Sequence, residues 1–309
     1  STLFPYTTLF RSILFAGALA GAADDLTTSY NNLKEAVAAK DAAAVKKLAQ
    51  ETHVLAKEVM DTADPEDADQ KKIMAERKRF AAEVDGYVEY SLFATAVQAE
   101  PGTLVDLMKD LETLNPKSKY LAGAYGCYFA ALLKERESAK IVEIAGKAIV
   151  HFPNCPDLLM VLADHALAQK QAARAGSYAE RVITVFTKHA KPETVAAAEW
   201  DRMRTMALGR AYWMAGLAHG EKNEHFQCDK DFRAALPYIK DNPQMLAPAL
   251  FYLGVSNYYL GRSAMNHAQI LEGSKFSEQC SKIPGPYQRQ AWTNAHLMKT
   301  EADKLVLRK

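Results

Sequence analysis

The stretch that decides the fold begins at residue 125 and reads YGCYFAALLKERESAKIVEIAGKAIVHFP, to residue 153. At an offset of 34, residues 159–187 read LMVLADHALAQKQAARAGSYAERVITVFT. A period of this length is typical of a helix-turn-helix unit that repeats along the chain. Laid over each other, the two stretches place apolar or small residues opposite one another: Tyr125 and Leu159, Tyr128 and Leu162, Leu132 and Ala166, Ile141 and Ala175, Ala145 and Ala179, and Ala148 and Val182.

Two Leu-Gly pairs continue the pattern further along the chain. Leu208-Gly209 is followed by Tyr212, and Leu253-Gly254 is followed by Asn257. A small residue at such a position lets the two helices of a hairpin approach closely, while large neighbours fill the gap. The arrangement resembles the L-G-x-x-Y core of the tetratricopeptide repeat family. The resemblance covers residues 120–285, about half of the chain.

This resemblance implies an all-α fold, a right-handed superhelix of antiparallel helix hairpins, with the repeats over residues 119–285. The sequence departs from the family in places. Pro153 occupies the family's closing proline in the first unit, but Thr187 stands there in the second. The third unit has a lengthened helix at 192–207 and about seven extra residues in its hairpin loop, GEKNEH at 220–225. The number of units and the regularity of the superhelix therefore stay open.

In the resembled family, partners lie in a concave groove lined by the first helix of each hairpin. Carried over by register, the groove positions combine Met and aromatic side chains with a few charges, which is typical of adaptable protein-binding surfaces. They are Lys134, Met160, Asp164, Met206, Arg210, Trp213, Met214, Phe251, Tyr258 and Tyr259. The same stripe at helical spacing also suits a core face packed against other helices. The residue pattern is compatible with both interpretations.

Residues 23–118 precede the repeats and form a separate predicted helical region. Periodicity predicts an antiparallel pair of helices over 26–39 and 42–59, broken at Lys40, with Asp41 capping the second helix. The acidic run DTADPEDADQ, residues 61–70, is followed at once by basic residues. Acid before base favours one long helix, whose N-terminus attracts negative charge. A calcium site is the alternative for the acidic run, although the D-x-D-x-D-G spacing is missing.

The predicted long helix continues through aromatic and apolar residues spaced by three and four, until Pro101 and Gly102 end it. These residues are Phe80, Val84, Tyr87, Tyr90 and Phe93. Thr103 then starts a shorter helix, with Asp106 completing a capping-box-like signal.

Residues 286–309 are predicted to form an end helix with one wet face, which a stack of repeats needs to close it. The apolar face holds Trp292, Ala295, Met298, Ala302 and Leu305, and the polar face holds Arg289, Asn294, Lys299 and Asp303.

The amino-terminal residues predict export. Residues 1–12, STLFPYTTLFRS, lack an initiator Met and resemble a translated adapter, so we expect a non-native scar. Residues 13–22 are typical of the remnant of a signal peptide, because a short apolar stretch precedes the A-x-A spacing of Ala20 and Ala22. We expect cleavage after Ala22 and a periplasmic or extracellular protein. No later segment reaches about 18 apolar residues, so no membrane span is expected.

Charge and cysteine content narrow the function further. Lys plus Arg is 38 against 37 for Asp plus Glu, so the net charge of +1 gives no field that attracts nucleic acid. No nucleic-acid partner is therefore expected. The four cysteines, Cys127, Cys155, Cys228 and Cys280, fit an oxidising compartment and allow three disulfide connectivities. Buried thiols are the alternative.

Motifs of catalysis are missing from the sequence. It holds no G-x-S-x-G, no Gly-rich phosphate loop and no H-E-x-x-H, so we expect neither an enzyme nor a cofactor. His225 and Cys228 would share a helix face, but two ligands do not close a metal site. The leading hypothesis is a scaffold that binds a protein or peptide partner. Self-assembly into an oligomer or filament is the alternative, since near-zero net charge gives little self-repulsion; a metal-binding protein or an enzyme ranks below both.

Overall fold

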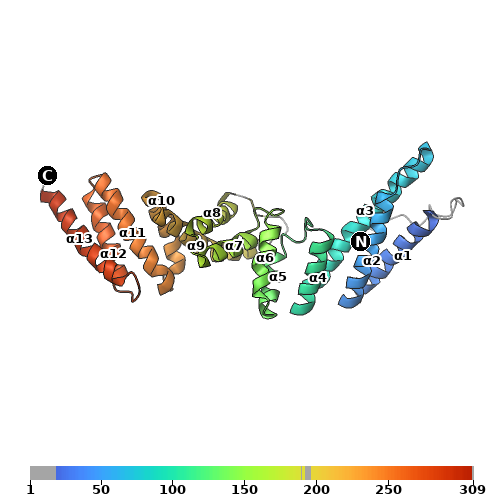
Figure 1. Ribbon diagram of the computed structural model, residues 1–309, viewed down its shortest axis with the longest axis horizontal. Coiled ribbons are helices and arrows are strands. Elements are labelled where there is room, and N and C mark those ends of the chain that lie inside the picture. Colours follow the sequence, from blue (N-terminus) through green and yellow to red (C-terminus); the bar gives the residue numbers. More distant parts are fainter. Residues whose placement is uncertain (1–18, 189, 192–195, 308–309) are drawn as a thin grey trace. The chain divides into compact units, whose positions relative to one another are not determined.

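The computed structural model describes residues 19–188, 190–191 and 196–307 (Figure 1). Within these residues it holds thirteen α-helices and no strand, which confirms the all-α prediction. The predicted scar at 1–12 and most of the predicted signal remnant lie outside the described residues. The chain divides into two compact units, Ser1–Ser138 and Ala139–Lys309, here unit 1 and unit 2. This boundary falls inside the first predicted repeat rather than at residue 118.

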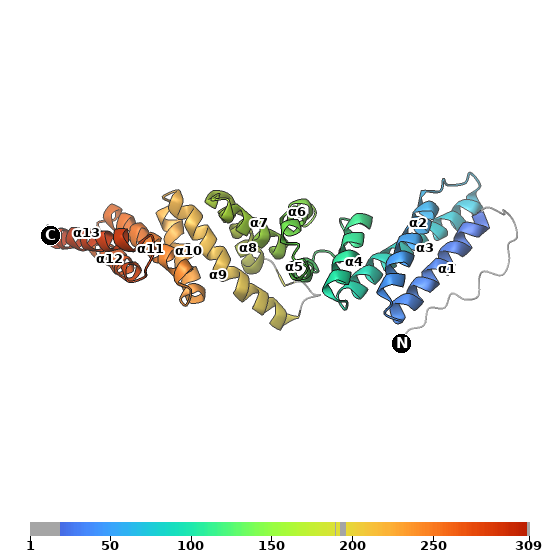
Figure 2. The same cartoon turned by 60° about the horizontal axis from the view of Figure 1, so that its bottom comes forward.

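Unit 1 is built from helices that pack on their chain neighbours. Helices α1 and α2 pair, both contact α3, α2 and α3 contact α4, and α4 contacts α5 (Figure 2). The helices are α1 (Leu19–Ala38), α2 (Ala42–Asp61), α3 (Ala68–Ala96), α4 (Pro101–Leu114) and α5 (Tyr125–Lys134). One buried cluster at the centre of the unit contains Leu26, Ala56, Val59, Ala81 and Val84.

The first hairpin of unit 1 has the predicted break and the predicted cap. Helix α1 ends just before Lys40, and the Asp41 carboxylate accepts a hydrogen bond of 3.0 Å from the backbone N–H of Ala44. An acceptor at this position satisfies one of the free donors of the first turn of α2. The expected cleavage point after Ala22 lies within α1.

The acidic run connects α2 and α3 instead of forming the start of one long helix. Of the acidic residues of the run, Asp61 ends α2 and only Asp69 lies in α3, because Pro65 interrupts the helical backbone and Asp67 caps α3 by accepting from the N–H groups of Asp69 and Gln70. Asp64 accepts a hydrogen bond of 2.8 Å from Lys78. The acids therefore serve as a cap and as ion-pair partners.

Two details of α3 and α4 differ from the prediction. Helix α3 ends at Ala96, and Pro101 begins α4 instead of ending α3, since a proline at the first helical position lacks only an N–H that would be free anyway. Glu100 precedes it without a side-chain cap, so Thr103 and Asp106 make no capping box. The predicted apolar face of α3 also splits: Val84 is buried, whereas Phe80 and Tyr90 keep 37% and 44% of their surface exposed.

Unit 2 is a stack of helix hairpins. Each helix from α7 onward packs on the next, and α7, α9, α11 and α13 also contact one another in that order (Figures 1 and 2). We call α7, α9 and α11 the first helices, because each opens a hairpin. The helices are α6 (Ser138–Ala148), α7 (Pro156–Ala168), α8 (Ala172–Lys188), α9 (Ala197–Glu221), α10 (His225–Ile239), α11 (Pro243–Ser263), α12 (His267–Ser281) and α13 (Gln288–Leu307).

The same turn recurs after five of the described helices. In each, one residue other than glycine adopts a left-handed conformation, and two backbone hydrogen bonds reach back into the preceding helix, as in a Schellman motif. At Lys170, for example, its N–H bonds to the Leu167 carbonyl at 2.9 Å and the Gln171 N–H bonds to the Ala166 carbonyl at 2.9 Å. The five left-handed residues are Lys40, Arg136, Lys170, Asn223 and Met265.

Two of these turns are separated by the predicted period. Arg136 and Lys170 are separated by the offset of 34 found in the sequence, and α5 and α7 end two residues before them. Every apolar position that the offset paired is buried in both stretches. A helix, this turn and a second helix therefore recur at the predicted offset in these two stretches.

Glycines bring the helices of unit 2 into close contact, as predicted for the Leu-Gly pairs. A methyl group on Gly209 would overlap the Tyr238 side chain of α10, and one on Gly254 would lie 3.1 Å from the Gly273 carbonyl oxygen of α12. The predicted long loop at GEKNEH is wrong, because α9 runs to Glu221 and only three residues separate it from α10. Gly220 lies in that last turn against the Tyr252 ring, which explains why a glycine stands inside a helix.

The final helix covers the end of the stack with a narrower apolar face than predicted. Ala295, Met298 and Ala302 are buried against unit 2, but Trp292 is 58% exposed and lies outside that face. Arg289, Lys299 and Asp303 are exposed as expected. The side chain of Leu305 lies outside the described residues.

Candidate functional site

The predicted groove residues lie in both units. Lys134 ends α5 in unit 1, and the other nine lie on the first helices of unit 2. Local sequence explains where two of these helices begin. Pro156 and Pro243 open α7 and α11, and the Asn242 side chain caps α11 by accepting from the N–H groups of Gln244 and Met245.

The structure brings five of the predicted residues together on α7 and α9. Met160 and Asp164 are one turn apart on α7, and Met206, Arg210 and Trp213 follow one face of α9 at spacings of four and three. The Arg210 guanidinium lies 2.7 Å from Asp164 Oδ1 and joins the two rows. We call these five residues the α7–α9 face. Met206 is its most open member, with 73% of its surface exposed.

The ion pair within the α7–α9 face is only partly satisfied. Burial raises the pKa of Asp164, and the facing Arg210 acts in the opposite direction. Although the two groups are within ion-pair distance, Asp164 Oδ1 is buried and makes no hydrogen bond with good geometry. Arg210 therefore offsets the charge of the carboxylate without replacing all of its lost hydration.

Trp213 ties the α7–α9 face to α11. Its indole Nε1 donates a hydrogen bond of 2.8 Å to the Met245 carbonyl, and its ring packs against the core clusters on both sides of α9. This contact crosses from one first helix to the next. Trp213 is thus held in place by the stack and supports the face instead of projecting from it.

The remaining predicted residues point elsewhere. Met214 and Phe251 are buried members of core clusters, so the core interpretation holds for these two. Tyr258 packs against the cluster that joins α12 and α13. Tyr259 stacks on His225 of α10, with ring centroids 4.6 Å apart and an angle of 8° between the planes. The predicted strip is therefore not continuous along α11.

A histidine surrounded by carboxylates is the strongest polar cluster that sequence reasoning missed. His219 Nδ1 lies 2.7 Å from Asp231 Oδ2, and its Nε2 lies 3.2 Å from Glu180 Oε1 and 3.5 Å from Glu224 Oε2. Carboxylates face both ring nitrogens, and only the doubly protonated imidazolium donates from both. Burial raises the pKa of Asp231, and the His219 hydrogen bond and charge act against that rise.

This cluster, which we call the His219 clasp, joins three helices. Glu180 comes from α8, His219 from α9, and Glu224 and Asp231 from the start and middle of α10. The sequence placed His219 and Glu224 in a loop, and no spacing rule connects them to Glu180. Predicting this cluster requires the contacts between helices of successive hairpins, which the sequence alone does not provide.

A second polar network crosses α10, α11 and α12. The fully buried Asn257 donates to Asp229 Oδ1 at 2.6 Å and accepts from Arg233 at 3.2 Å. Arg233 also bonds to both oxygens of Asp229 and lies 2.9 Å from Glu272 Oε1. One signal for this network was visible, because Asn257 stands where the resembled family has tyrosine.

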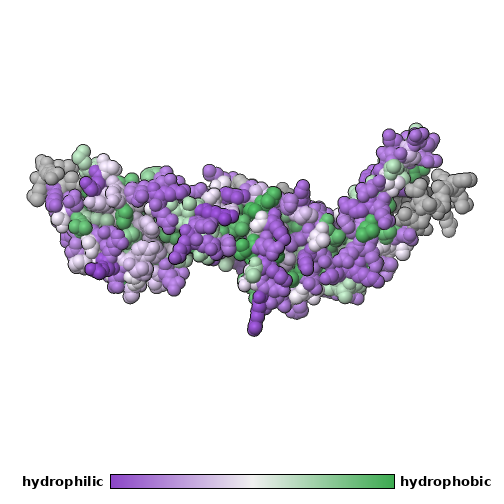
Figure 3. All heavy atoms as spheres, viewed as in Figure 1, coloured by the Kyte–Doolittle hydropathy of each residue, from purple (hydrophilic) through white to green (hydrophobic). Residues whose placement is uncertain are grey.

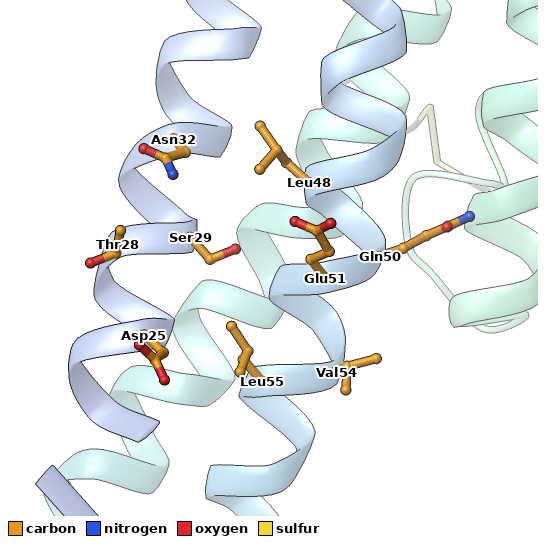
Figure 4. Close-up of a pocket in the computed structure, with 9 residues that line it drawn as sticks. All are labelled: Asp25, Thr28, Ser29, Asn32, Leu48, Gln50, Glu51, Val54 and Leu55. Atoms are coloured by element: carbon orange, nitrogen blue, oxygen red, sulfur yellow. The ribbon is translucent and has the colours of Figure 1, made fainter. Parts of the chain in front are cut away.

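An open depression of about 610 Å³ lies between α1 and α2 of unit 1 (Figure 4). Ser29 points from α1 toward α2, whereas Gln50 points away and donates to Asp110 at 3.2 Å. None of the predicted groove residues lines the depression. Its lining residues are Asp25, Thr28, Ser29, Asn32, Leu48, Gln50, Glu51, Val54 and Leu55.

The alternatives of metal binding and disulfide bonding receive little support from the described residues. Cys228 is fully buried and burial raises its thiol pKa to about 12, while His225 is occupied by the Tyr259 ring. Across the residues that the structure describes, no group of three or more His, Cys, Asp or Glu is arranged to hold a metal ion. Cys228 and Cys280 are free and buried, which favours the buried-thiol interpretation for these two.

Comparison with known proteins adds no assignment. The chain matches no family model, and no curated protein matches it. The tetratricopeptide likeness therefore rests on the repeat pattern alone. Among the described helices, none combines the length and the apolar character needed to cross a bilayer.

Proposed function

We propose that the chain is a scaffold that binds a polypeptide segment along the α7–α9 face. The observation that supports this best is the side-by-side packing of the first helices, which leaves Met206 and Arg210 exposed on one layer of the stack. A layer of parallel helices offers a partner a continuous row of side chains.

The chemistry of the α7–α9 face suits a polypeptide. Met206 is flexible and polarizable, so it can adapt to apolar side chains of different shapes. Arg210 provides planar N–H donors for carboxylate or backbone carbonyl groups, and its ion pair with Asp164 fixes one side of the guanidinium. Hydrophilic residues cover most of the surface drawn in Figure 3, with apolar residues in small patches. We therefore expect a small anchoring contact instead of a broad apolar interface.

The test uses peptides selected by display against the immobilised full chain. Affinity is measured by fluorescence anisotropy for the unmodified chain, Met206→Asp and Arg210→Glu. We expect each variant to weaken binding by about tenfold or more, since anchors of this kind contribute more than about 1 kcal/mol. Phe226→Asp, on the 67% exposed Phe226 of α10, is the matched control and should leave affinity unchanged. Equal binding by all four proteins would overturn the assignment of the face.

We propose in addition that the hairpins form a superhelix and that the protein is exported. The stacked hairpins with their period of 34 support a right-handed superhelix of the tetratricopeptide type. Small-angle X-ray scattering that matches no superhelical arrangement of the hairpins would contradict it. The A-x-A spacing before residue 23 supports export. Expression in a bacterium, followed by amino-terminal sequencing of the periplasmic or secreted product, should give a chain that starts at Ala23.

Self-assembly is a second candidate, which one observation on α13 favours. Trp292 and Leu297 are 58% and 60% exposed on a helix that was expected to present a polar face. Exposed apolar side chains on a terminal helix can receive the opposite end of another copy, in a head-to-tail contact. Light scattering over a wide concentration range tests this. We expect oligomers that disappear in the double variant Trp292→Ala, Leu297→Ser; a monomer at every concentration would remove the candidate.

A further inference from the structure

Six aromatic rings form a continuous row in unit 1. Ring centroids are 6.1 Å apart for Phe80 and Tyr30, 5.2 Å for Tyr30 and Tyr87, and 5.9 Å for Tyr87 and Tyr90. The row continues through Tyr120, whose centroid is 5.9 Å from Tyr90 and 5.4 Å from Phe93. We call this row the aromatic ladder. It combines rings from α1, α3 and the segment after α4.

The aromatic ladder lies outside the core of α3. The residues of α3 that fill the core are aliphatic, with Val84, Val88 and Leu92 almost fully buried. The aromatic residues occupy the adjoining face, where Phe80 is 37% and Tyr90 is 44% exposed. Large exposed aromatic groups are frequent at binding surfaces because one end of the ring stays accessible.

The chain itself already places cations over two rings of the ladder. The Lys34 ammonium lies 4.3 Å from the Tyr30 ring centroid, and the Lys119 ammonium lies 5.1 Å from that of Tyr120. The negative face of an aromatic ring attracts a cation at such distances. Tyr90 stands between these two positions, and within the described part of the chain no cation lies over its ring.

One acidic side chain, that of Glu83, lies close enough to the ladder to act on the Tyr30 ring. The pKa of Tyr30 is raised by burial and, in second place, by the nearby charge of Glu83. Carboxylates beside electron-rich ring faces favour a positively charged visitor over a neutral or negative one. An apolar ligand bound to the ladder would instead remove water from the Glu83 carboxylate without offering a hydrogen bond in return.

We propose that the aromatic ladder binds lysine or arginine side chains of a partner polypeptide, with Tyr90 as the central ring. The rise along an extended chain places side chains of one side about 6.6 Å apart. Neighbouring ladder rings are 5.2 to 6.1 Å apart, so an extended segment with a basic residue at alternate positions matches the row. This surface is separate from the α7–α9 face, and the two proposals stand or fall independently.

The experiment compares two fluorescein-labelled peptides on the full chain by fluorescence anisotropy. One alternates Arg and Gly, and the other carries citrulline in place of every Arg, which keeps the shape of the side chain and removes its charge. We expect the Arg peptide to bind and the citrulline peptide to bind at least about tenfold more weakly. Equal affinity for the two peptides would overturn the proposal.

Three variants separate the ring face from mere apolar contact. Tyr90→Leu keeps a large apolar side chain that suits a helix, yet we expect it to lose about tenfold in affinity for the Arg peptide, whereas Tyr90→Phe should retain binding. Tyr238→Leu, at a tyrosine that is 48% exposed on α10 of unit 2, is the matched control and should bind normally. Circular dichroism confirms that each variant is folded.

Other outcomes would assign the ladder differently. Unchanged affinity in Tyr90→Leu, together with its loss in Glu83→Gln, would mean that the carboxylate alone attracts the peptide, and the proposal would fail. Binding of the neutral sugar cellohexaose that disappears in Tyr90→Leu, without binding of the Arg peptide, would make the ladder a glycan surface and would equally overturn it.

Discussion

Most of the described glycines of unit 2 pack against a neighbouring helix, whereas Gly86 and Gly123 of unit 1 do not. In unit 1, a methyl group added to Gly86 or Gly123 would meet no atom within 4 Å. In unit 2, the corresponding methyl group on Gly209, Gly254 or Gly273 would overlap a neighbouring helix. Helices of unit 2 therefore approach through missing side chains, whereas those of unit 1 are held apart by aliphatic and aromatic ones. Glycine is therefore a packing requirement at these three positions of unit 2 and a tolerated weakness at Gly86 of unit 1, although Gly146 of unit 2 is as open as Gly86.

The units also differ in how charged groups join their helices. Unit 2 contains the His219 clasp and the Asn257 network, in each of which one buried side chain, Asp231 or Asn257, depends on partners from neighbouring helices. In unit 1, the closest counterpart is His53, whose Nδ1 lies 2.6 Å from Asp85 Oδ1, with Lys57 3.5 Å from the other oxygen. Because Lys57 remains when His53 is lost, Asp85 always keeps a cation. Loss of one group should therefore harm unit 2 more than unit 1.

The largest effect is expected for His219→Ala. This change leaves the buried Asp231 carboxylate without its hydrogen-bond partner and near two further carboxylates, and leaving a buried charge unpaired in this way costs about 3 kcal/mol. Tryptophan fluorescence during urea unfolding measures the loss in unit 2, since Trp200, Trp213 and Trp292 all lie there. His53→Ala is the control and should cost about 1 kcal/mol, read by circular dichroism. Equal losses would erase the electrostatic difference between the units.

Gly254→Ala should destabilise unit 2 by about 2 kcal/mol. The added methyl group on α11 meets the Ser277 hydroxyl and the Gly273 carbonyl of α12. Helix α12 cannot move away without disturbing its packing on α13. The tryptophan transition should shift to lower urea while the far-ultraviolet signal of unit 1 keeps its midpoint. A neutral result would show that α12 can retreat, and the contrast drawn from glycine would not hold.

Alkaline pH should weaken unit 2 through its buried thiols. Burial raises the pKa of Cys228 from its ordinary value of 9.0 to about 12, so the folded state holds this proton more tightly than the unfolded state. The contribution of this thiol to the free energy of unfolding is fully present below pH 9 and is lost as the pH rises toward 12. The stability difference between the unmodified chain and Cys228→Ala should thus shrink by about 1 kcal/mol between pH 9 and pH 10. A difference that is constant over this interval would contradict the prediction.

The smallest effect is a gain in unit 1. Gly86→Ala should stabilise α3 by about 0.5 to 1 kcal/mol, because alanine loses less backbone entropy in a helix and nothing stands in the way of its methyl group. The unit 1 transition, followed by circular dichroism, should move to higher urea. A loss of stability at this position would mean that Gly86 is under a packing constraint like that of Gly254.

Local signals in the sequence predicted much of the fold. The offset of 34 identified buried positions in two hairpins, because a repeated helix pair must repeat its apolar face. Asp41 was recognisable as a cap from its place between two periodic segments. Pro101 and Gly220 misled the prediction, since both residue types usually mark the end of a helix. One begins α4, and the other makes room for Tyr252 inside α9.

The candidate site was less predictable, because it depends on contacts between hairpins. Helical spacing grouped Met206 with Arg210 but could not tell that Met214 and Phe251 are buried. The same limit applies to α3, where Val84 and Tyr87 share a periodic pattern although the first is buried and the second belongs to the aromatic ladder. The His219 clasp had no local signal at all, since Glu180 and Asp231 come from two other helices.

The recurring three-residue turn has a consequence for how the chain folds. Each of these turns joins two helices that follow one another in the sequence, and most helix contacts in either unit join chain neighbours. Proteins dominated by such local contacts fold quickly, because little loop entropy is lost before the contacts form. A ribosome adds about 5 to 20 residues per second, so a hairpin of this size takes seconds to emerge. We expect each hairpin to close as soon as its second helix has left the ribosome, so that folding proceeds in the order of synthesis.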